Sequence, residues 1–272
     1  LMLLNPVFGY RQQADAQECI NTILQVLHTA LTVNVKINNM PGIGNSDSFE
    51  LQRLGNGRYA GHIKANGYSI VEELFGSQFL SKLVYEDCEH VSYSHDPYSI
   101  VPVPIPEKVL TLYDCFDFFI EPETVQNVTC EKCGVQKSAV KQLSFWTLPQ
   151  VLVIQLKRFD HAMKKIEKFV QAPPTLNMSK YVTHPRVSEI IKSDPSALQL
   201  YDLKSVICHE GGLGGGHYYA RCWRPEDTTD KGNWINFNDA SVNPVTEDQI
   251  QNVANYCFFY EMRNSSKHVW SL

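Results

Sequence analysis

Apolar residues recur at helical spacing near the start of the chain. Within residues 11–31 they fall mostly three or four positions apart, at Ala16, Ile20, Ile23, Leu24, Leu27 and Leu31. This period puts them on one face of a helix, so the pattern predicts an amphipathic helix over 11–31. The following segment, 38–67, carries glycine and proline among polar residues, which interrupt regular structure. We expect a loop or a poorly ordered excursion there.

Strand patterns dominate the second half of the chain. Residues 110–119 still look helical, but 151–156 are β-branched or aliphatic, as is typical of a buried strand. Turns rich in Gly or Asp separate four more strand candidates, at 201–208, 217–223, 234–238 and 256–262. Prolines lack the N–H that a central strand needs, which predicts an extended edge segment around Pro97, Pro102, Pro104 and Pro106. Helices followed by strands favour an α+β fold.

The composition is that of a globular protein, with 43% hydrophobic and 19% charged residues. A net charge of −5 without a basic stripe argues against nucleic acid as a partner. The chain has no run of about 18 apolar residues, which argues against a membrane span. Eight cysteines in 272 residues are too sparse for a disulfide scaffold, so we expect a cytoplasmic or nuclear location. The first residue is Leu1 rather than Met, which favours a chain cut from a longer protein.

Two groups of residues could carry chemistry. His217 begins one predicted strand, and Asn238 and Asp239 end a nearby one. An oxygen of either could hold the imidazole in one tautomer and leave its other nitrogen to activate a nucleophile. Taken alone, His217 fits a structural histidine at a strand edge more readily. The second group, Cys130-x-x-Cys133, is half of a zinc knuckle, and its alternative is a pair of free thiols in a turn.

Five ordered motifs resemble those of the ubiquitin-specific proteases. They are a histidine box at 201–211 and 216–220, its continuation at 234–242, a closing strand at 256–260, Leu148-Pro149 with Lys157-Arg158-Phe159, and Gln12-Gln13 with Asp15-Ala16-Gln17-Glu18. The resemblance implies an α+β, papain-like cysteine peptidase fold with a palm and fingers of antiparallel sheet and a partial helical thumb. It implies one catalytic domain over 1–272, with the thumb helix at 11–31, the fingers at 75–145 and the palm at 146–263.

The resemblance also implies a function. Proteins of this family cleave the bond after the C-terminal glycine of ubiquitin, so ubiquitin and ubiquitinated proteins are the expected partners. His217 matches the general base and Asn238 its orienting partner, with Asp239 assisting. The residues expected to line the channel for the ubiquitin tail, or to lie near its arginines, are Gln13, Asp15, Glu18, His209 and Tyr218. Ordinary solvated helix charge is the alternative for Asp15 and Glu18. No cofactor is expected for catalysis.

The chain departs from the family pattern at three places. The Asn-x-Cys segment that carries the nucleophile is missing, so this chain by itself is expected to be inactive. One finger cysteine is replaced by Tyr85, leaving Cys88, Cys130 and Cys133, with His90 nearby, to hold a structural zinc ion. Fingers held by their sheet without metal are the alternative. The extra residue Ala14 indicates that the helix starts after it or that the tail contacts differ.

Three functions remain open from the sequence. The first is a thiol-dependent deubiquitinase whose nucleophile segment lies outside this chain. The second is a catalytically dead ubiquitin-binding scaffold, against which the intact set of His217, Asn238 and Asp239 argues. The third is a zinc-ribbon interaction module, which requires metal at the cysteine cluster and no cleft beside His217.

Overall fold

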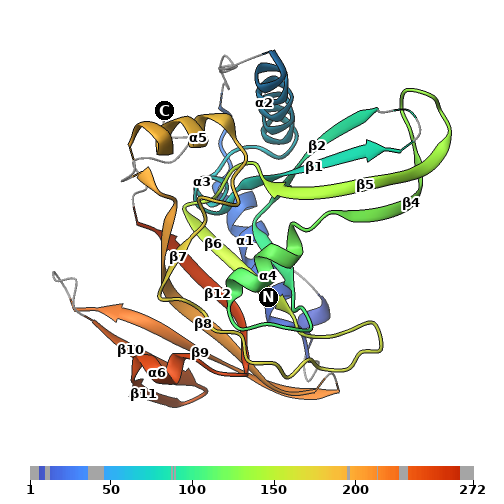
Figure 1. Cartoon of the computed structure of the whole chain (residues 1–272). Coiled ribbons are helices and arrows are strands. Elements are labelled where there is room, and N and C mark those ends of the chain that lie inside the picture. The colour runs from blue at the N-terminus through green and yellow to red at the C-terminus, as the bar shows by residue number, and fades with distance from the viewer. Residues whose placement is uncertain are drawn as a thin grey trace.

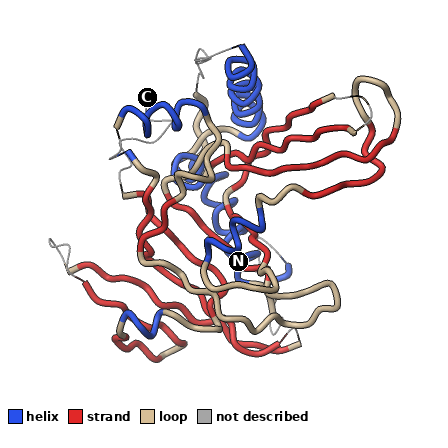
Figure 2. Tube along the Cα trace, in the orientation of Figure 1, coloured by secondary structure: helices blue, strands red, loops and turns tan. Residues whose placement is uncertain are grey.

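Two β-sheets form the framework of the chain in the computed structural model, which describes residues 6–9, 13–35, 46–86, 88, 90–194, 197–212, 214–226 and 232–263. The smaller sheet has four strands in the order β2-β1-β5-β4, and the larger has eight, in the order β11-β10-β9-β8-β12-β6-β3 with β7 added against β8. The smaller sheet projects to one side of the larger one (Figure 1), and α4 lies between the two groups of strands in this view (Figure 2). The predicted α+β class is confirmed.

The larger sheet contains every strand that the sequence predicts in the second half of the chain. Its strands are β3 (Ile100–Pro104), β6 (Val151–Lys157), β7 (Thr175–Asn177), β8 (Leu200–Gly212), β9 (Gly215–Pro225), β10 (Gly232–Asn238), β11 (Ser241–Val245) and β12 (Asn255–Met262). Neighbours pair antiparallel except β3 and β6, which are parallel. The larger sheet is therefore mixed, whereas a purely antiparallel palm is expected from the sequence. The chain between β3 and β6 is long enough for the crossover that parallel strands need.

The smaller sheet is antiparallel throughout. It consists of β1 (Ser77–Tyr85), β2 (Val91–Tyr98), β4 (Glu123–Thr129) and β5 (Gln136–Phe145). The prolines of the predicted edge segment fall on or beside β2 and β3, and each of these strands lies at the edge of its sheet. The edge prediction is confirmed, because a missing N–H is tolerated where no neighbour needs it.

Six α-helices and one 3₁₀ helix are present in the described residues. They are η1 (Pro6–Phe8), α1 (Ala16–Leu31), α2 (Ser46–Asn66), α3 (Ile70–Phe75), α4 (Leu112–Phe119), α5 (Pro185–Ser193) and α6 (Glu247–Ile250). Helix α4 buries Leu112, Cys115 and Phe116 completely, in one cluster with Val101 and Val103 of β3. Burying one such large apolar side chain contributes about 1.5 to 3 kcal/mol, so this layer fixes α4 on the larger sheet.

Helix α1 starts later than the apolar pattern suggests. Asp15 is its N-cap residue, and its Oδ1 accepts a hydrogen bond from the backbone N–H of Gln17 at 2.7 Å. An N-cap carboxylate satisfies a donor that the first helical turn leaves free. The helix therefore begins after Ala14, which is one of the two outcomes that the extra residue predicts. Residues 10–12 lie outside the described part of the chain.

The loop predicted for 38–67 is wrong over most of its length. Residues 46–66 form α2, although the helix contains Gly55, Gly57 and Gly61, and each glycine in a helix costs about 1 kcal/mol relative to alanine. Tertiary packing overrides this cost at Gly55, where an added Cβ would lie 2.6 Å from Nε1 of Trp146. Glycine permits close packing there. Residues 38–45 lie outside the described residues.

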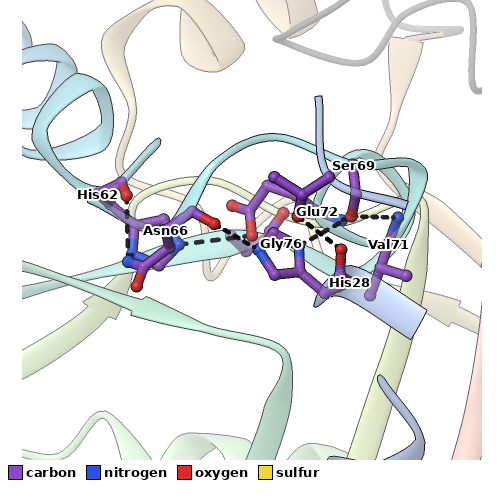
Figure 3. Close-up of polar contacts among 9 residues, drawn as sticks. His28, His62, Asn66, Ser69, Val71, Glu72 and Gly76 are labelled. Carbon is purple, nitrogen blue, oxygen red and sulfur yellow. Dashed lines mark hydrogen bonds and ion pairs between the residues drawn. The ribbon is translucent and has the colours of Figure 1, made fainter. Parts of the chain in front are cut away.

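A polar network joins helices α1, α2 and α3 (Figure 3). The Ser69 hydroxyl accepts from the backbone N–H of Val71 and lies 2.8 Å from Nδ1 of His28. Nε2 of His28 lies 3.0 Å from the carbonyl oxygen of Asn66. A carbonyl only accepts, so Nε2 carries the proton and Nδ1 accepts from Ser69. Nε2 of His62 lies 3.5 Å from the carboxylate of Glu72. These contacts fix α1 and α2 against α3.

Candidate active site

The predicted base and its partner meet at the end of the larger sheet. His217 is the third residue of β9, and Asn238 is the last residue of the neighbouring strand β10. Nε2 of His217 lies 2.6 Å from Oδ1 of Asn238. An amide oxygen only accepts, so Nε2 is the protonated nitrogen. In the neutral ring, Nδ1 then carries a lone pair that can accept a proton.

Asp239 stands farther from the imidazole than Asn238. It follows β10 with φ of +50°, in the left-handed region that Asp adopts more readily than most residues. Its Oδ2 lies 3.9 Å from Nε2 of His217, and its side chain is 84% exposed. At this distance and exposure its carboxylate makes no hydrogen bond to the ring and could reach it only through its charge. Asn238 is therefore the direct partner of the ring.

Glycine allows the hairpin between β8 and β9 to pack tightly. A Cβ on Gly216 would lie 2.2 Å from Nε2 of His209. Gly211 has φ of +91°, and a Cβ there would lie 2.5 Å from the carbonyl oxygen of Gly215. A side chain at either position would displace the backbone beside His217. The glycines of the histidine box thus let one strand pass close to the other.

Asp15 connects the start of α1 to the larger sheet. Its Oδ2 accepts hydrogen bonds from the hydroxyl of Tyr256 at 2.6 Å and from that of Tyr218 at 3.3 Å. The Oε1 atom of Gln13 accepts from the backbone N–H of Gly216 at 3.2 Å. Burial and the carboxylate of Asp15 raise the pKa of both tyrosines, so their hydroxyls remain donors. The segment before α1 is therefore held beside His217.

A groove lies where these elements meet. It has a volume of about 400 Å³ and is lined by Gln13, Ala14, Asp15, Phe159, His209, Gly212, Gly216 and Tyr218. Four of the five residues predicted to bind substrate are in this lining. Glu18 is the fifth; it is half-buried on α1 and is not part of the lining. His217 is not in the lining itself; it lies on β9 between the lining residues Gly216 and Tyr218, and its side chain projects from the other face of the strand.

His209 forms an apolar wall of the groove rather than a charged one. It is 4% exposed, and its ring lies 4.5 Å from that of Tyr218. Burial, together with the nearby Lys165 ammonium, lowers the pKa of His209, which keeps the ring neutral. Its Nδ1 has no hydrogen-bond partner among the described residues. This nitrogen is buried, and the His209 ring is tilted 33° from that of Tyr218, so the wall presents two inclined aromatic rings.

Sequence reasoning missed two residues that shape the groove. The ammonium of Lys165 donates to the carbonyl oxygens of His209 and Gly211, both at 2.8 Å. Arg158 is buried and donates to the carbonyl oxygens of Asn255, Ile166 and Lys168. Together they fasten the segment 158–168, which carries Phe159 into the groove. The Lys-Arg-Phe motif contains Arg158, but nothing in the sequence indicates what this residue does. No local pattern marks Lys165.

None of the described cysteines is placed as a nucleophile. Burial raises the pKa of Cys115 to about 12 and that of Cys208 to about 11, and it also raises the pKa of Cys257 well above its ordinary value. A thiol with a raised pKa is protonated and reacts poorly. Among the described residues, no hydrogen bond joins His217 to a cysteine. The candidate base has its partner Asn238, but none of the described thiols is hydrogen-bonded to it.

Cys88, Cys130 and Cys133 come together at the far end of the smaller sheet. Their sulfur atoms lie within 4.8 Å of one another, and those of Cys88 and Cys130 are 3.5 Å apart. Burial opposes ionisation of Cys130, but backbone N–H groups of Cys133 and Lys132 bring its pKa below the ordinary value. Three cysteine sulfurs with N–H donors nearby suit zinc, which binds cysteine as the thiolate. These three residues could hold zinc, and His90 is outside the group, with its ring stacked on Tyr85 at 5.8 Å.

Comparisons with known proteins agree with this geometry. The sequence model of the ubiquitin carboxyl-terminal hydrolase family matches residues 1–260. The chain is 29% identical to ubiquitin carboxyl-terminal hydrolase 5 of Saccharomyces cerevisiae, covering 95% of this chain and 33% of that protein. It is also 29% identical to hydrolase 2 of Rattus norvegicus, covering 93% of this chain and 40% of that protein.

A solved structure shows the same fold. The SAGA Ubp8/Sgf11/Sus1/Sgf73 deubiquitinase module bound to ubiquitin aldehyde superimposes with a TM-score of 0.70 at 27% identity, over 96% of this chain and 52% of that one. The chain thus spans about a third to a half of the length of these relatives. Within the described residues, no helix is both long and apolar enough to cross a membrane. By its sequence match and its fold, the chain belongs to the ubiquitin carboxyl-terminal hydrolase family, in its ubiquitin-specific protease branch.

Proposed function

We propose that this chain is the greater part of the catalytic domain of a thiol-dependent deubiquitinase, which cleaves the peptide or isopeptide bond after the C-terminal glycine of ubiquitin. The observation that carries the proposal is the 2.6 Å contact between Nε2 of His217 and Oδ1 of Asn238, beside a groove lined by Asp15, His209 and Tyr218. The nucleophile is a cysteine outside residues 1–272.

The tautomer of His217 sets the chemistry. Nε2–H donates to Asn238, so Nδ1 takes the proton of the thiol and leaves a thiolate. The thiolate attacks the carbonyl carbon of the terminal glycine, and the imidazolium then gives its proton to the departing amine. Water, deprotonated by the same ring, releases the acyl group from sulfur. Asn238 holds the ring in one tautomer through both steps, and Asp239 assists from 3.9 Å away.

The groove suits a narrow, extended substrate tail. His209 and Tyr218 form an aromatic wall of the groove, beside which residues without side chains would fit. Asp15 supplies a negative charge at the start of α1 that can attract a basic side chain of the tail. Glu18, one turn farther along α1, adds charge near this end of the helix. Gln13 orients the backbone of Gly216 and lines the same groove.

We assign the observed elements to the thumb, fingers and palm subdomains that the family resemblance implies. The thumb contains α1 (predicted at 11–31), the fingers are the smaller sheet (predicted at 75–145), and the palm is the larger sheet (predicted at 146–263). Strand β3 departs from these bounds, since Ile100–Pro104 pairs with β6 of the larger sheet. The expected partners are ubiquitin and ubiquitinated proteins in the cytoplasm or nucleus.

Structural zinc at the fingertips is a separate part of the proposal. Cys88, Cys130 and Cys133 supply three thiolates, and the metal has no part in the cleavage. Metal analysis of the purified protein should find zinc bound to each chain, and Cys133→Ser should lose it. Wild-type protein that unfolds at the same temperature with and without its zinc would show fingers held by their sheet alone.

Labelling with a ubiquitin that carries an electrophile at its C-terminus tests the proposed function. The full-length protein should form a covalent adduct at a cysteine outside residues 1–272, and this chain alone should form none. An adduct at any of its eight cysteines would contradict the account of the nucleophile. Ubiquitin binding by a full-length protein that forms no adduct would point to a scaffold without catalysis.

A further inference from the structure

A tyrosine and a glutamate stand behind the candidate base. In the antiparallel pairing of β8 with β9, Glu210 lies opposite His217 and Cys208 lies opposite Tyr219. Side chains alternate between the faces of a strand, so His217, Tyr219 and Arg221 share one face, and Glu210 projects from the same face of the next strand. Glu210 and Tyr219 therefore flank His217 without being part of the groove lining.

The contacts among these side chains form a continuous support. The Tyr219 hydroxyl donates to Oε1 of Glu210 at 2.9 Å, and the Tyr219 ring lies 6.4 Å from the His217 ring at 24° to it. The Arg221 guanidinium carbon lies 5.3 Å from the centre of the Tyr219 ring. Arg221 is itself held by the carbonyl oxygen of Gln249 and by Asn236. Tyr219 is thus fixed at its hydroxyl and at its ring.

His217 needs such a support because its own restraint is slight. Within the described parts of the chain the ring has one hydrogen bond, to Asn238, and its side chain is 44% exposed. A single hydrogen bond leaves the imidazole free to rotate about the line from Nε2 of His217 to Oδ1 of Asn238. Tyr219 is 8% exposed, and burial, with the hydrogen bond to Glu210 among further causes, raises its pKa. It therefore remains a phenol that donates to Glu210 throughout the range in which a thiol protease works.

We infer that Glu210 and Tyr219 are a positioning pair for His217: the carboxylate of Glu210 holds Tyr219, and the Tyr219 ring limits the tilt of the imidazole so that Nδ1 faces the nucleophile. The inference rests on the proposed function, since it assigns a role in the same reaction. The charged groups that surround His217 are Glu210 on β8, Arg221 on β9 and Asp239 after β10. The pair acts through geometry, so an uncharged hydrogen-bond acceptor at position 210 should suffice.

Variants of the full-length protein separate geometry from charge. Tyr219→Phe removes the hydroxyl, Glu210→Ala removes the acceptor, and Glu210→Gln keeps an acceptor without the charge. With a fluorogenic ubiquitin amide, Tyr219→Phe and Glu210→Ala should lower kcat about fivefold with KM unchanged, as expected for a loss confined to the chemical step. Glu210→Gln should retain kcat within about twofold. Glu261→Gln, at an exposed glutamate paired with Lys204 on the same sheet, is the matched control and should leave kcat unchanged.

A second measurement reads the ring directly. The imidazole nitrogen chemical shifts of His217 report its tautomer, and Tyr219→Phe and Glu210→Ala should add signals of a second ring state that Glu210→Gln lacks. Wild-type kcat and unchanged shifts in the first two variants would overturn the inference, and so would a loss that Glu210→Gln fails to rescue. Failure of the proposed function is distinct, because the wild-type protein would then hydrolyse no ubiquitin amide while the shifts still report on His217.

Discussion

At the scale of single residues, the site depends on which oxygen meets the imidazole. Asn238 lies 2.6 Å from Nε2 of His217, whereas Asp239 lies 3.9 Å away and is largely exposed. A neutral acceptor in direct contact fixes the tautomer, and a solvated charge contributes little. Loss of the Asn238 side chain should therefore lower kcat much more than loss of the Asp239 side chain.

Substitution of each residue by alanine tests this difference. In the full-length protein, Asn238→Ala should lower kcat about 10²-fold, because the ring loses the partner that sets its tautomer. Asp239→Ala should lower it less than about threefold. Steady-state hydrolysis of a ubiquitin amide measures both. Equal losses, or a larger loss at Asp239, would assign the orienting role to the carboxylate.

The site residues that could be predicted from the sequence are those that lie within a recognisable motif. His217, Asn238, His209 and Tyr218 lie in one histidine box, and the structure brings them together with Asp15. The tyrosine contacts of Asp15 span more than 200 residues of sequence, and those of Lys165 span more than 40. No periodicity encodes such contacts. Glu18 matches the motif, yet it is outside the groove lining.

At the scale of elements, strands were easier to predict than the second helix. The runs at 151–156 and 201–208 are β6 and part of β8, because buried strands need β-branched and aliphatic residues. The glycines of 46–66 favour a loop by propensity, but packing of Gly55 against Trp146 and His95 stabilises α2. Propensity is a weak guide where a helix is held by its neighbours.

Alanine at each glycine of α2 separates propensity from packing. Gly57 and Gly61 have open space around a built Cβ, so alanine there should raise the free energy of unfolding by about 0.5 to 1 kcal/mol each. Gly55→Ala should lower it by about 1 kcal/mol or more, since its Cβ would lie 2.6 Å from Nε1 of Trp146. Urea unfolding measures all three. Stabilisation by Gly55→Ala would show that α2 does not pack against Trp146.

At the scale of the whole molecule, two buried histidines pack against Trp146, the residue directly after β5. Trp146 lies between His95 of β2 and His184, the N-cap residue of α5, with ring centres 4.8 and 4.6 Å away. Both histidines are almost completely buried. Burial lowers the pKa of each to about 4 from the ordinary 6.5. The folded chain therefore needs both rings neutral.

Stability should fall as the solution becomes mildly acidic. Above pH 6.5 both rings are neutral in the folded and unfolded chains; below it, protons bind the unfolded chain first, until the folded pKa of about 4 is reached. The free energy of unfolding should fall by about 1 kcal/mol per histidine between pH 7.5 and 5.5. Urea unfolding across this range measures it, and His95→Leu should reduce the slope. A flat profile over this range would contradict the burial of the two neutral rings.

The central claim is that His217 acts as the base for a cysteine in another part of the same protein. Comparison of the full-length protein with its His217→Ala variant, by hydrolysis of a fluorogenic ubiquitin amide and by ubiquitin binding, tests it most directly. Hydrolysis should fall at least about 10³-fold, with the Kd for ubiquitin within about twofold of wild type. Turnover that survives the loss of the imidazole would contradict the account.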